Sequence, residues 1–290
     1  MIIDIHTHIT APEIIARREA YCQRDAWFSA LYENPRARLA TAEALVGALD
    51  EVRVDRAVTF GFAWADMGLC RAANDYTMEA VQHHEGRLTG FAVVNPRQAR
   101  EAIRELERCA SGGLRGVGEL MPDGQGFSLD DVSLLTPLAE SAARHHLPIL
   151  VHSSEPVGHR YPGKGTVSPE AICSFAQAFP EVTLICAHWG GGLPFYELMP
   201  EVRGVLAHVY YDTAASPFIY DDRILPLLAQ LVPHKICFGS DFPLISPGRC
   251  LRSFRSVGLD PEPLEAVLGG NASRVLGLTN SGPTLTRKEC

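Results

Sequence analysis

The chain has 290 residues, of which 46% are hydrophobic and 21% are charged. This composition excludes a disordered chain, a collagen and a coiled coil. With 26 basic against 34 acidic side chains, the net charge of −8 argues against a dedicated nucleic-acid or anionic-membrane binder. It favours a small-molecule partner. The sequence shows neither a long apolar span nor a signal-peptide pattern, so we expect a cytoplasmic protein with no membrane contact.

Short apolar, β-branched runs recur along the chain and predict buried strands. They lie at residues 2–5, 56–60, 88–94, 114–118, 148–151, 182–186, 206–211 and 235–238. Their ends are about 33 residues apart on average, which is the length of a strand-helix unit rather than of a hairpin. The spacing therefore predicts parallel strands.

Segments with helical periodicity lie between these strands. They include residues 41–50, 97–110, 134–146 and 169–179. Eight such units predict one α/β domain, a (β/α)8 TIM barrel over residues 1–280, followed by a polar tail at 281–290 that we expect to be mobile. An open doubly wound sheet is the alternative. It is disfavoured because a histidine pair, rather than a glycine-rich phosphate turn, follows the first strand.

Ionisable side chains follow five of the predicted strands, where the mouth of a barrel forms. They are His6, His8, Glu119, His152, His188 and Asp241. His6 and His8 point to the same side of an extended segment and can chelate one cation. A lone pair of this kind is weak evidence. With His152 and Asp241 at an equivalent depth, it predicts a metal site, and imidazole with carboxylate suits Zn²⁺.

Three of these residues each have a structural alternative. His188 precedes three glycines and could cap or pack, and Glu119 could be a surface acid at a helix start. Asp241 could cap the turn before Phe-Pro. Beside a divalent ion, a catalytic role for Asp241 is favoured over turn capping, because its carboxylate can accept a proton from water. We expect Asp241 and His188 to be catalytic and Glu119 to bind the metal or its water.

Several motifs together resemble the amidohydrolase superfamily. They are Asp4-x-His6-x-His8, His152, His188 before the glycines, Gly-Ser-Asp241-Phe-Pro, and GNASRVLGL at residues 270–278. The match is specific and spans the chain. It is most similar to the branch that contains aminocarboxymuconate-semialdehyde decarboxylase, resorcylate decarboxylases and pyrone-dicarboxylate lactonase. The resemblance implies a distorted (β/α)8 barrel, a divalent metal held by His6, His8, His152 and Asp241, and a catalytic His188.

The sequence departs from the decarboxylases of that branch at the fourth strand. Glu119 stands in a Gly-Glu setting that looks more like hydrolases and deoxyribonucleases of the superfamily, where such a glutamate can bind or bridge metals. No lysine is present there to form a carboxylated bridge, and the known decarboxylases of the branch are longer. These points favour hydrolysis.

Candidate substrate contacts lie in two places. Residues 10–40 and 153–168 form long connections that we expect at the mouth, and the second contains His159, Arg160 and Tyr161. Arg160 could bind a substrate carboxylate, although loop charges are often only solvated. Trp64 and Trp189, with Phe62, could wall a planar ligand or simply pack in the core.

The sequence thus predicts a metal-dependent hydrolase of a small ester, lactone or amide that acts through metal-activated water. The first alternative is a nonoxidative decarboxylase of a small unsaturated or aromatic acid on the same site, with Arg160 holding the carboxylate. A nuclease is disfavoured by the negative charge. A noncatalytic metal-binding barrel is the remaining alternative. A homodimer is compatible with the sequence, and the metal expected first is zinc.

Overall fold

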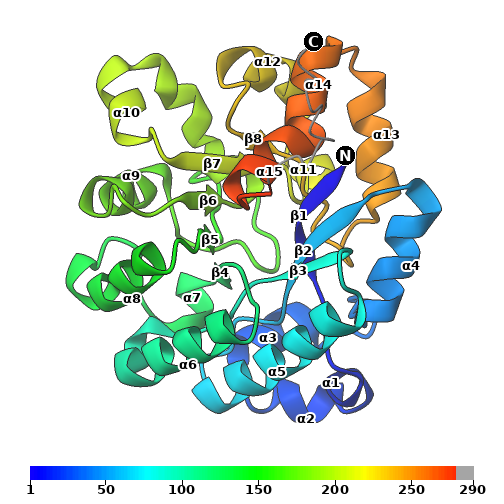
Figure 1. The fold of residues 1–290 in the computed structure, drawn as a ribbon, viewed down its shortest axis with the longest axis vertical. Helices are drawn as coiled ribbons and strands as arrows, with labels where there is room; N and C mark the ends of the chain where they lie inside the picture. Colours follow the sequence, from blue (N-terminus) through cyan, green and yellow to red (C-terminus); the bar gives the residue numbers. More distant parts are fainter. Residues whose placement is uncertain (279–290) are drawn as a thin grey trace, which may run out of the picture.

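A computed structural model describes residues 1–278, and the tail predicted at 281–290 lies outside the described residues. Eight parallel strands lie at the centre, with helices around them (Figure 1). The strands are β1 (Ile3–His8), β2 (Arg56–Phe60), β3 (Leu88–Gly90), β4 (Val117–Leu120), β5 (Ile149–Val151), β6 (Leu184–Cys186), β7 (Val209–Asp212) and β8 (Ile236–Cys237). They are buried almost throughout because helices cover one side and the barrel interior lies on the other.

The strands form two ladders, β1-β2-β3 and β4-β5-β6-β7-β8, which backbone hydrogen bonds join into a ring. Between β3 and β4, the amides of Ala92 and Gly118 donate to the carbonyls of Gly116 and Ala92. Between β8 and β1, the Ile5 amide donates to the Phe238 carbonyl at 2.8 Å. Irregular pairing at these two seams makes the barrel distorted, as the resemblance implied.

Helices follow the strands and form the outer layer, together with the short helical segments η1 (Pro96–Gln98), η2 (His188–Leu198) and η3 (Ala266–Gly270). The α-helices are α1 (Pro12–Ala16), α2 (Arg18–Cys22), α3 (Ala26–Tyr32), α4 (Ala42–Val52), α5 (Met67–His83), α6 (Ala99–Ser111), α7 (Pro122–Gln125), α8 (Val132–Arg144), α9 (Pro169–Ala178), α10 (Pro200–Val205), α11 (Ser216–Ile219), α12 (Ile224–Leu231), α13 (Pro247–Ser256), α14 (Pro261–Glu265) and α15 (Asn271–Val275). The helices predicted from periodicity correspond to α4, α6, α8 and α9. Within residues 1–278, none of the helices has the length and apolar content to cross a membrane.

Seven of the eight strands differ from the predicted runs at one end or both, and β1 extends to His8, so His6 and His8 lie within that strand rather than after it. β3 ends at Gly90, earlier than predicted, and beyond it Ala92 forms an isolated bridge with Val117 of β4. β4 begins later than predicted and extends to Leu120, so Glu119 lies within the strand rather than after it. β7 begins at Val209, because Leu206 caps α10. The apolar runs therefore identified the strands but not their ends.

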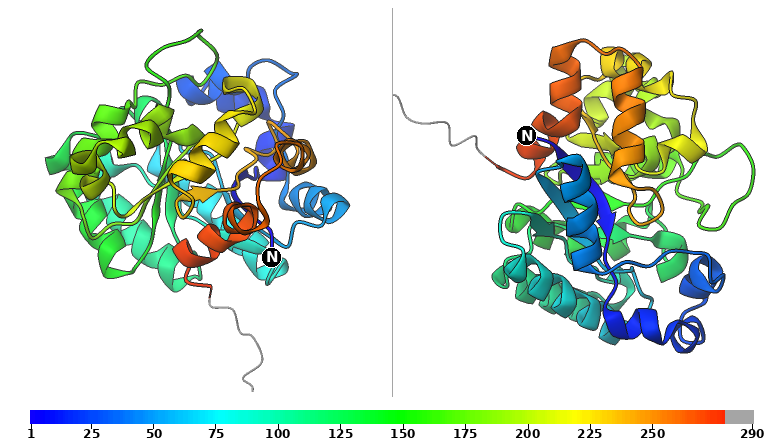
Figure 2. Two further views of the ribbon diagram at one scale, coloured as in Figure 1. Left: turned by 90° about the horizontal axis from the view of Figure 1, so that it is seen from above. Right: turned by 90° about the vertical axis from the view of Figure 1, so that its right-hand side faces the viewer.

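The two long connections lie on the same side of the barrel. Residues 10–40 fold into α1, α2 and α3, and the loop between β5 and α9 projects from the body (Figure 2). The two connections approach each other, since a side chain at Gly163 would come within 3.0 Å of Leu31. Asp123 after β4 accepts hydrogen bonds from the amide and hydroxyl of Thr166, at 2.8 Å each, which holds the base of the loop.

Asn271 anchors the last helix to the barrel. Its fully buried side-chain amide donates to the carbonyls of Pro233 and Ile236 at 2.9 and 2.7 Å. Pro233 precedes β8, and Ile236 is its first residue. The motif at 270–278 therefore binds the start of the strand that leads to Asp241. The asparagine therefore has a structural role here.

Replacing Asn271 with alanine should lower the free energy of unfolding by about 2 kcal/mol, because two buried carbonyls lose their donor. Urea denaturation measures this change. Gln82→Ala on the exposed face of α5 is the control and should change stability by no more than about 0.5 kcal/mol. Equal stability of the two variants would contradict the anchoring role.

Candidate active site

Two histidines of β1 form the base of the site. His6 and His8 point to the same side of the strand because side chains alternate along it, and their Nε2 atoms lie 3.1 Å apart. His6 is fully buried, whereas the His8 side chain is 16% exposed. The other ring nitrogen of His6, Nδ1, lies 2.7 Å from Oδ2 of Asp212 at the end of β7.

Asp241 reaches the same pair from the turn after β8. Its Oδ1 atom lies 3.3 Å from Nε2 of His8 and 3.7 Å from Nε2 of His6. The backbone there has a φ of 64°, a left-handed conformation that aspartate tolerates better than most residues. The Asp241 amide donates to the His6 carbonyl at 3.0 Å, which fixes the turn against β1.

Glu119 of β4 connects this group to a second one. Its Oε2 atom lies 3.8 Å from Nε2 of both His6 and His8. Its Oε1 atom lies 3.1 Å from Nδ1 of His152, after β5, and 3.9 Å from Nε2 of His188, after β6. The structure therefore brings all six predicted ionisable residues into one buried cluster, with Glu119 at its centre.

The donor atoms of His6, His8, Glu119 and Asp241 fit a divalent cation. The Nε2 atoms of His6 and His8 lie 3.1 Å from each other and 3.3 to 3.8 Å from the nearest oxygens of Glu119 and Asp241, which compares with the spacing of about 3.4 Å between ligands that surround one ion tetrahedrally at about 2.1 Å. Glu119 with His152 and His188 forms a second group of donors within range of a common ion. His152 contacts the first group through Glu119.

Opposite charges hold the cluster in its ionised forms. Burial by itself would lower the pKa of His6, but the carboxylates of Asp212 and Glu119 raise it to about 10. Burial by itself would raise the pKa of Glu119, but the charge on His6 and the hydrogen bond with His152 lower it to about 2. The hydrogen bond with His8 likewise holds the pKa of Asp241 well below its usual range, against the effect of burial. Carboxylates that stay ionised are ready cation ligands.

His188 begins a turn whose next residues, Trp189 to Gly192, all have positive φ. Its Nδ1 atom lies 3.0 Å from the Ala214 carbonyl, which can only accept, so this nitrogen carries a proton. Its Nε2 atom faces Nδ1 of His152 at 3.2 Å. The glycines are required for close packing, because a Cβ at Gly191 would lie 2.5 Å from the Ser154 carbonyl oxygen.

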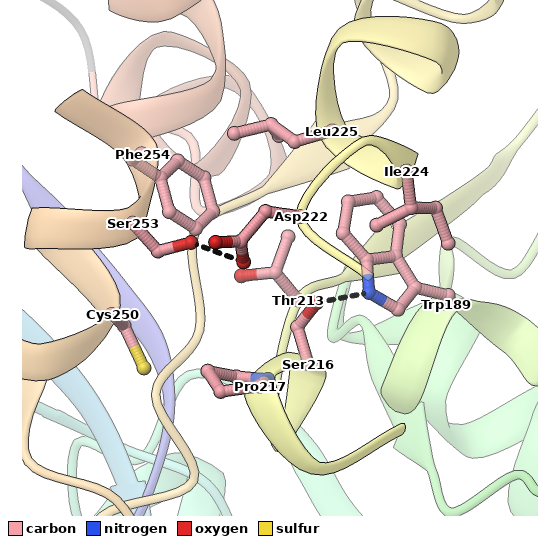
Figure 3. A pocket seen from close by; sticks show the side chains of 10 residues that line it. All are labelled: Trp189, Thr213, Ser216, Pro217, Asp222, Ile224, Leu225, Cys250, Ser253 and Phe254. Atoms are coloured by element: carbon pink, nitrogen blue, oxygen red, sulfur yellow. Dashed lines mark hydrogen bonds between the residues drawn. The ribbon is translucent and has the colours of Figure 1, made fainter. Parts of the chain in front are cut away.

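The two tryptophans proposed as substrate contacts lie in the packed interior. Trp64 is 1% exposed and stacks near Phe28 and Phe62, with ring centroids 4.6 and 4.8 Å away. Trp189 is fully buried and lines a narrow cavity with Leu225, where its Nε1 donates to Ser216 Oγ at 2.9 Å (Figure 3). Both rings are therefore packed in the interior, and a contact of either ring with a substrate stays a prediction.

The loop after β5 carries the other proposed substrate contacts. His159 and Arg160 are exposed, and the half-buried Tyr161 donates to Glu155 Oε2 at 3.3 Å. The loop reaches the cluster through its backbone, since the Gly163 carbonyl lies 3.0 Å from Nε2 of His152. The role of this loop toward a substrate stays a prediction.

Asp212 is the site residue that the sequence analysis missed. It is fully buried and contacts both His6 and the backbone of His188. A signal was present, because Asp212 directly follows the seventh apolar run. The same rule that selected the other strand-end residues would have included it.

The family profile described as "Amidohydrolase" matches residues 3–278. The chain therefore belongs to the amidohydrolase family, which confirms the resemblance seen in the motifs. The match extends from β1 to the end of the described residues.

The chain is also similar to individual members of this family and to solved structures. The chain is 22% identical over 252 residues to the gamma-resorcylate decarboxylase of Polaromonas sp., across 72% of this chain and 76% of that protein. It is similar to the structure of 5-carboxyvanillate decarboxylase from Sphingomonas paucimobilis, with a TM-score of 0.80, 18% identity, and coverage of 96% and 99% of the two chains. It is also similar to the 5-carboxyvanillate decarboxylase of Novosphingobium aromaticivorans solved with manganese, with a TM-score of 0.77, 16% identity, and coverage of 96% and 97%. These similarities confirm the barrel fold.

The donor set predicts that His8→Ala and His152→Ala each lose most of the bound divalent metal, because each removes an imidazole from the cluster. Elemental analysis after purification measures the metal per chain, which should be about one ion and at most two in the parent protein. His83→Ala, on the exposed end of α5, should keep the full content. Full metal content in both cluster variants would rule out this site.

Proposed function

We propose that the protein is a metal-dependent decarboxylase that removes carbon dioxide from a small aromatic or unsaturated carboxylic acid without an oxidant. The observation that carries this proposal is the pair of buried imidazoles, His152 and His188, 3.2 Å apart beside the carboxylate donors. Such a pair can hold a proton next to a substrate. The names of the relatives, which are decarboxylases of aromatic acids, support this reaction over the hydrolysis favoured by the sequence.

The metal would be held by His6, His8, Glu119 and Asp241, with His152 beside them as the expected further ligand. A bound divalent ion would supply positive charge that attracts an anionic substrate and stabilises the negative charge left when carbon dioxide departs. The mixed imidazole and carboxylate donors suit manganese as well as zinc. Manganese is the first candidate, because a structure of a similar enzyme contains it.

His188 is the group we assign to proton delivery. Loss of carbon dioxide leaves an electron pair on the substrate carbon, and that carbon must then gain a proton. The Ala214 carbonyl accepts from Nδ1 of His188 and fixes the ring, so Nε2 faces the cluster. In its charged form the ring donates from both nitrogens, and Nε2 can pass its proton to the carbon.

Asp241 and Arg160 complete the assignment. Asp241 is 8% exposed, so it lies where the cluster opens, and its ionised carboxylate can take up or return a proton. Arg160 is an exposed cation on the loop whose backbone contacts His152, and we propose that it binds the substrate carboxylate.

Hydrolysis of a small ester, lactone or amide remains the second candidate. The observation that favours it is the presence of two carboxylates, Glu119 and Asp241, around the same two imidazoles. Either could accept a proton from an attacking water, with the other bound to the ion. Hydrolysis uses such a carboxylate to activate water, whereas decarboxylation uses it to take up and return the proton that the substrate carbon gains.

The test is a screen of the manganese- and zinc-loaded protein against hydroxybenzoic acids, unsaturated dicarboxylic acids, lactones, esters and amides. We expect one aromatic or unsaturated acid to release carbon dioxide in step with its disappearance. Protein stripped with a chelator is the control and should be inactive. Cleavage of a lactone, ester or amide without carbon dioxide would give the function to a hydrolase. Tight metal binding with no turnover would support the noncatalytic barrel.

Asp241→Asn should retain the fold and much of the metal but lose turnover by about a hundredfold or more, because an amide offers an oxygen but cannot accept a proton. Steady-state kinetics with the substrate from the screen, together with metal analysis, measures both quantities. Asp260→Asn, an exposed carboxylate before α14, should keep full activity. Near-parental turnover of Asp241→Asn would remove this residue from the mechanism.

A further inference from the structure

Asp212 contacts two residues of the candidate site. Its Oδ2 atom lies 2.7 Å from Nδ1 of His6, and both side chains are fully buried. Its Oδ1 atom accepts the backbone amides of His188 at 2.9 Å and Ala214 at 3.0 Å. Three donors are thus directed at the two oxygens of one carboxylate. None of the roles assigned above uses this residue.

The contact with His6 fixes which nitrogen of that ring carries a proton. An ionised carboxylate has no proton to donate, so the short contact requires a proton on Nδ1 of His6. In the neutral ring, the lone pair is then on Nε2. Nε2 is the atom that faces His8, Glu119 and Asp241. Asp212 therefore directs the metal-binding lone pair of His6 into the site.

The backbone of Gly239 packs closely against the contact between His6 and Asp212. A Cβ atom at Gly239, beside β8, would lie 3.1 Å from Cβ of His6 and 3.4 Å from Cβ of Asp212. The absence of a side chain at that position lets the two residues approach. The amides of His188 and Ala214 hold the other oxygen of the same carboxylate.

We propose that Asp212 is a positioning residue that selects the tautomer of His6 required for metal binding and ties it to the backbone of His188. The proposal rests on the metal site of the proposed function but not on the reaction catalysed there. Carboxylates that bind the outer nitrogen of a metal-ligating histidine typically contribute 10- to 100-fold to metal affinity. One buried group would thus couple a ligand on β1 to the proton-delivering residue after β6.

Asp212→Asn gives the sharpest test, because the amide has one oxygen and one NH₂ group. Two backbone amides face the Oδ1 position, so the asparagine oxygen should take that place. The NH₂ group would then donate to Nδ1 of His6 and move the ring proton to Nε2, where it blocks the ion. We expect zinc affinity, measured by competition with a chromophoric chelator, to fall by about 10- to 100-fold.

Asp4→Asn is the matched control. Asp4 is also fully buried, but its Oδ1 accepts the backbone amides of His6 and Ser240, and no hydrogen bond joins it to the His6 ring. It should keep the parental zinc affinity. In a His6→Ala background, Asp212→Asn should cause little further loss, because the ring through which it acts is gone.

A spectroscopic measurement tests the proposal without any variant. ¹⁵N NMR of the zinc-loaded parent protein with labelled histidine should show His6 bound through Nε2 and protonated at Nδ1. The opposite assignment would overturn the proposal even if Asp212→Asn failed to fold. Unchanged zinc affinity in Asp212→Asn, or an equal loss in the His6→Ala background, would also overturn it and leave the metal site intact. A parent protein that binds neither zinc nor manganese would overturn both proposals.

Discussion

The structure depends on the mutual neutralisation of ionisable side chains buried at one end of the barrel. An isolated charge in such a place would cost several kcal/mol, and each carboxylate there instead lies beside an imidazole. Glu119 is central, because its two oxygens face different histidine pairs. Where imidazoles and carboxylates are packed this densely, the same arrangement that permits their burial also provides the ligands for a cation.

The barrel provides this arrangement because parallel strands end at the same side. β1, β4, β5, β6, β7 and β8 each bring one or two polar side chains to that end, and the ring of hydrogen bonds fixes their spacing. The closure between β8 and β1 matters most, since it sets Asp241 against His6 through the backbone as well as through the side chains. The long connections then cover the opening without supplying the central donors.

Asp4 shows that not every polar residue of the first-strand motif serves the cluster. Its side chain is fully buried and accepts the amide of Ser240 at 2.9 Å, so it joins β1 to the segment after β8. Burial raises the pKa of Asp4 to about 7, whereas the charged partners of Glu119 lower its pKa. Two buried carboxylates of one barrel therefore differ in their environment. Asp4 accepts hydrogen bonds from backbone amides, whereas Glu119 faces imidazole rings.

The sequence by itself determined eight parallel strands that alternate with helices in a barrel, and it selected six of the cluster residues, because strand periodicity and strand-end position are local properties of the chain. The sequence could not show which of those side chains contact one another. That Glu119 links two histidine pairs, that Asp212 joins His6, and that Trp64 and Trp189 are packed inside were decided by contacts between distant segments. Side-chain burial and hydrogen-bond partners depend on how the ring closes and how loops fold over it, and neither is encoded in any single stretch of residues.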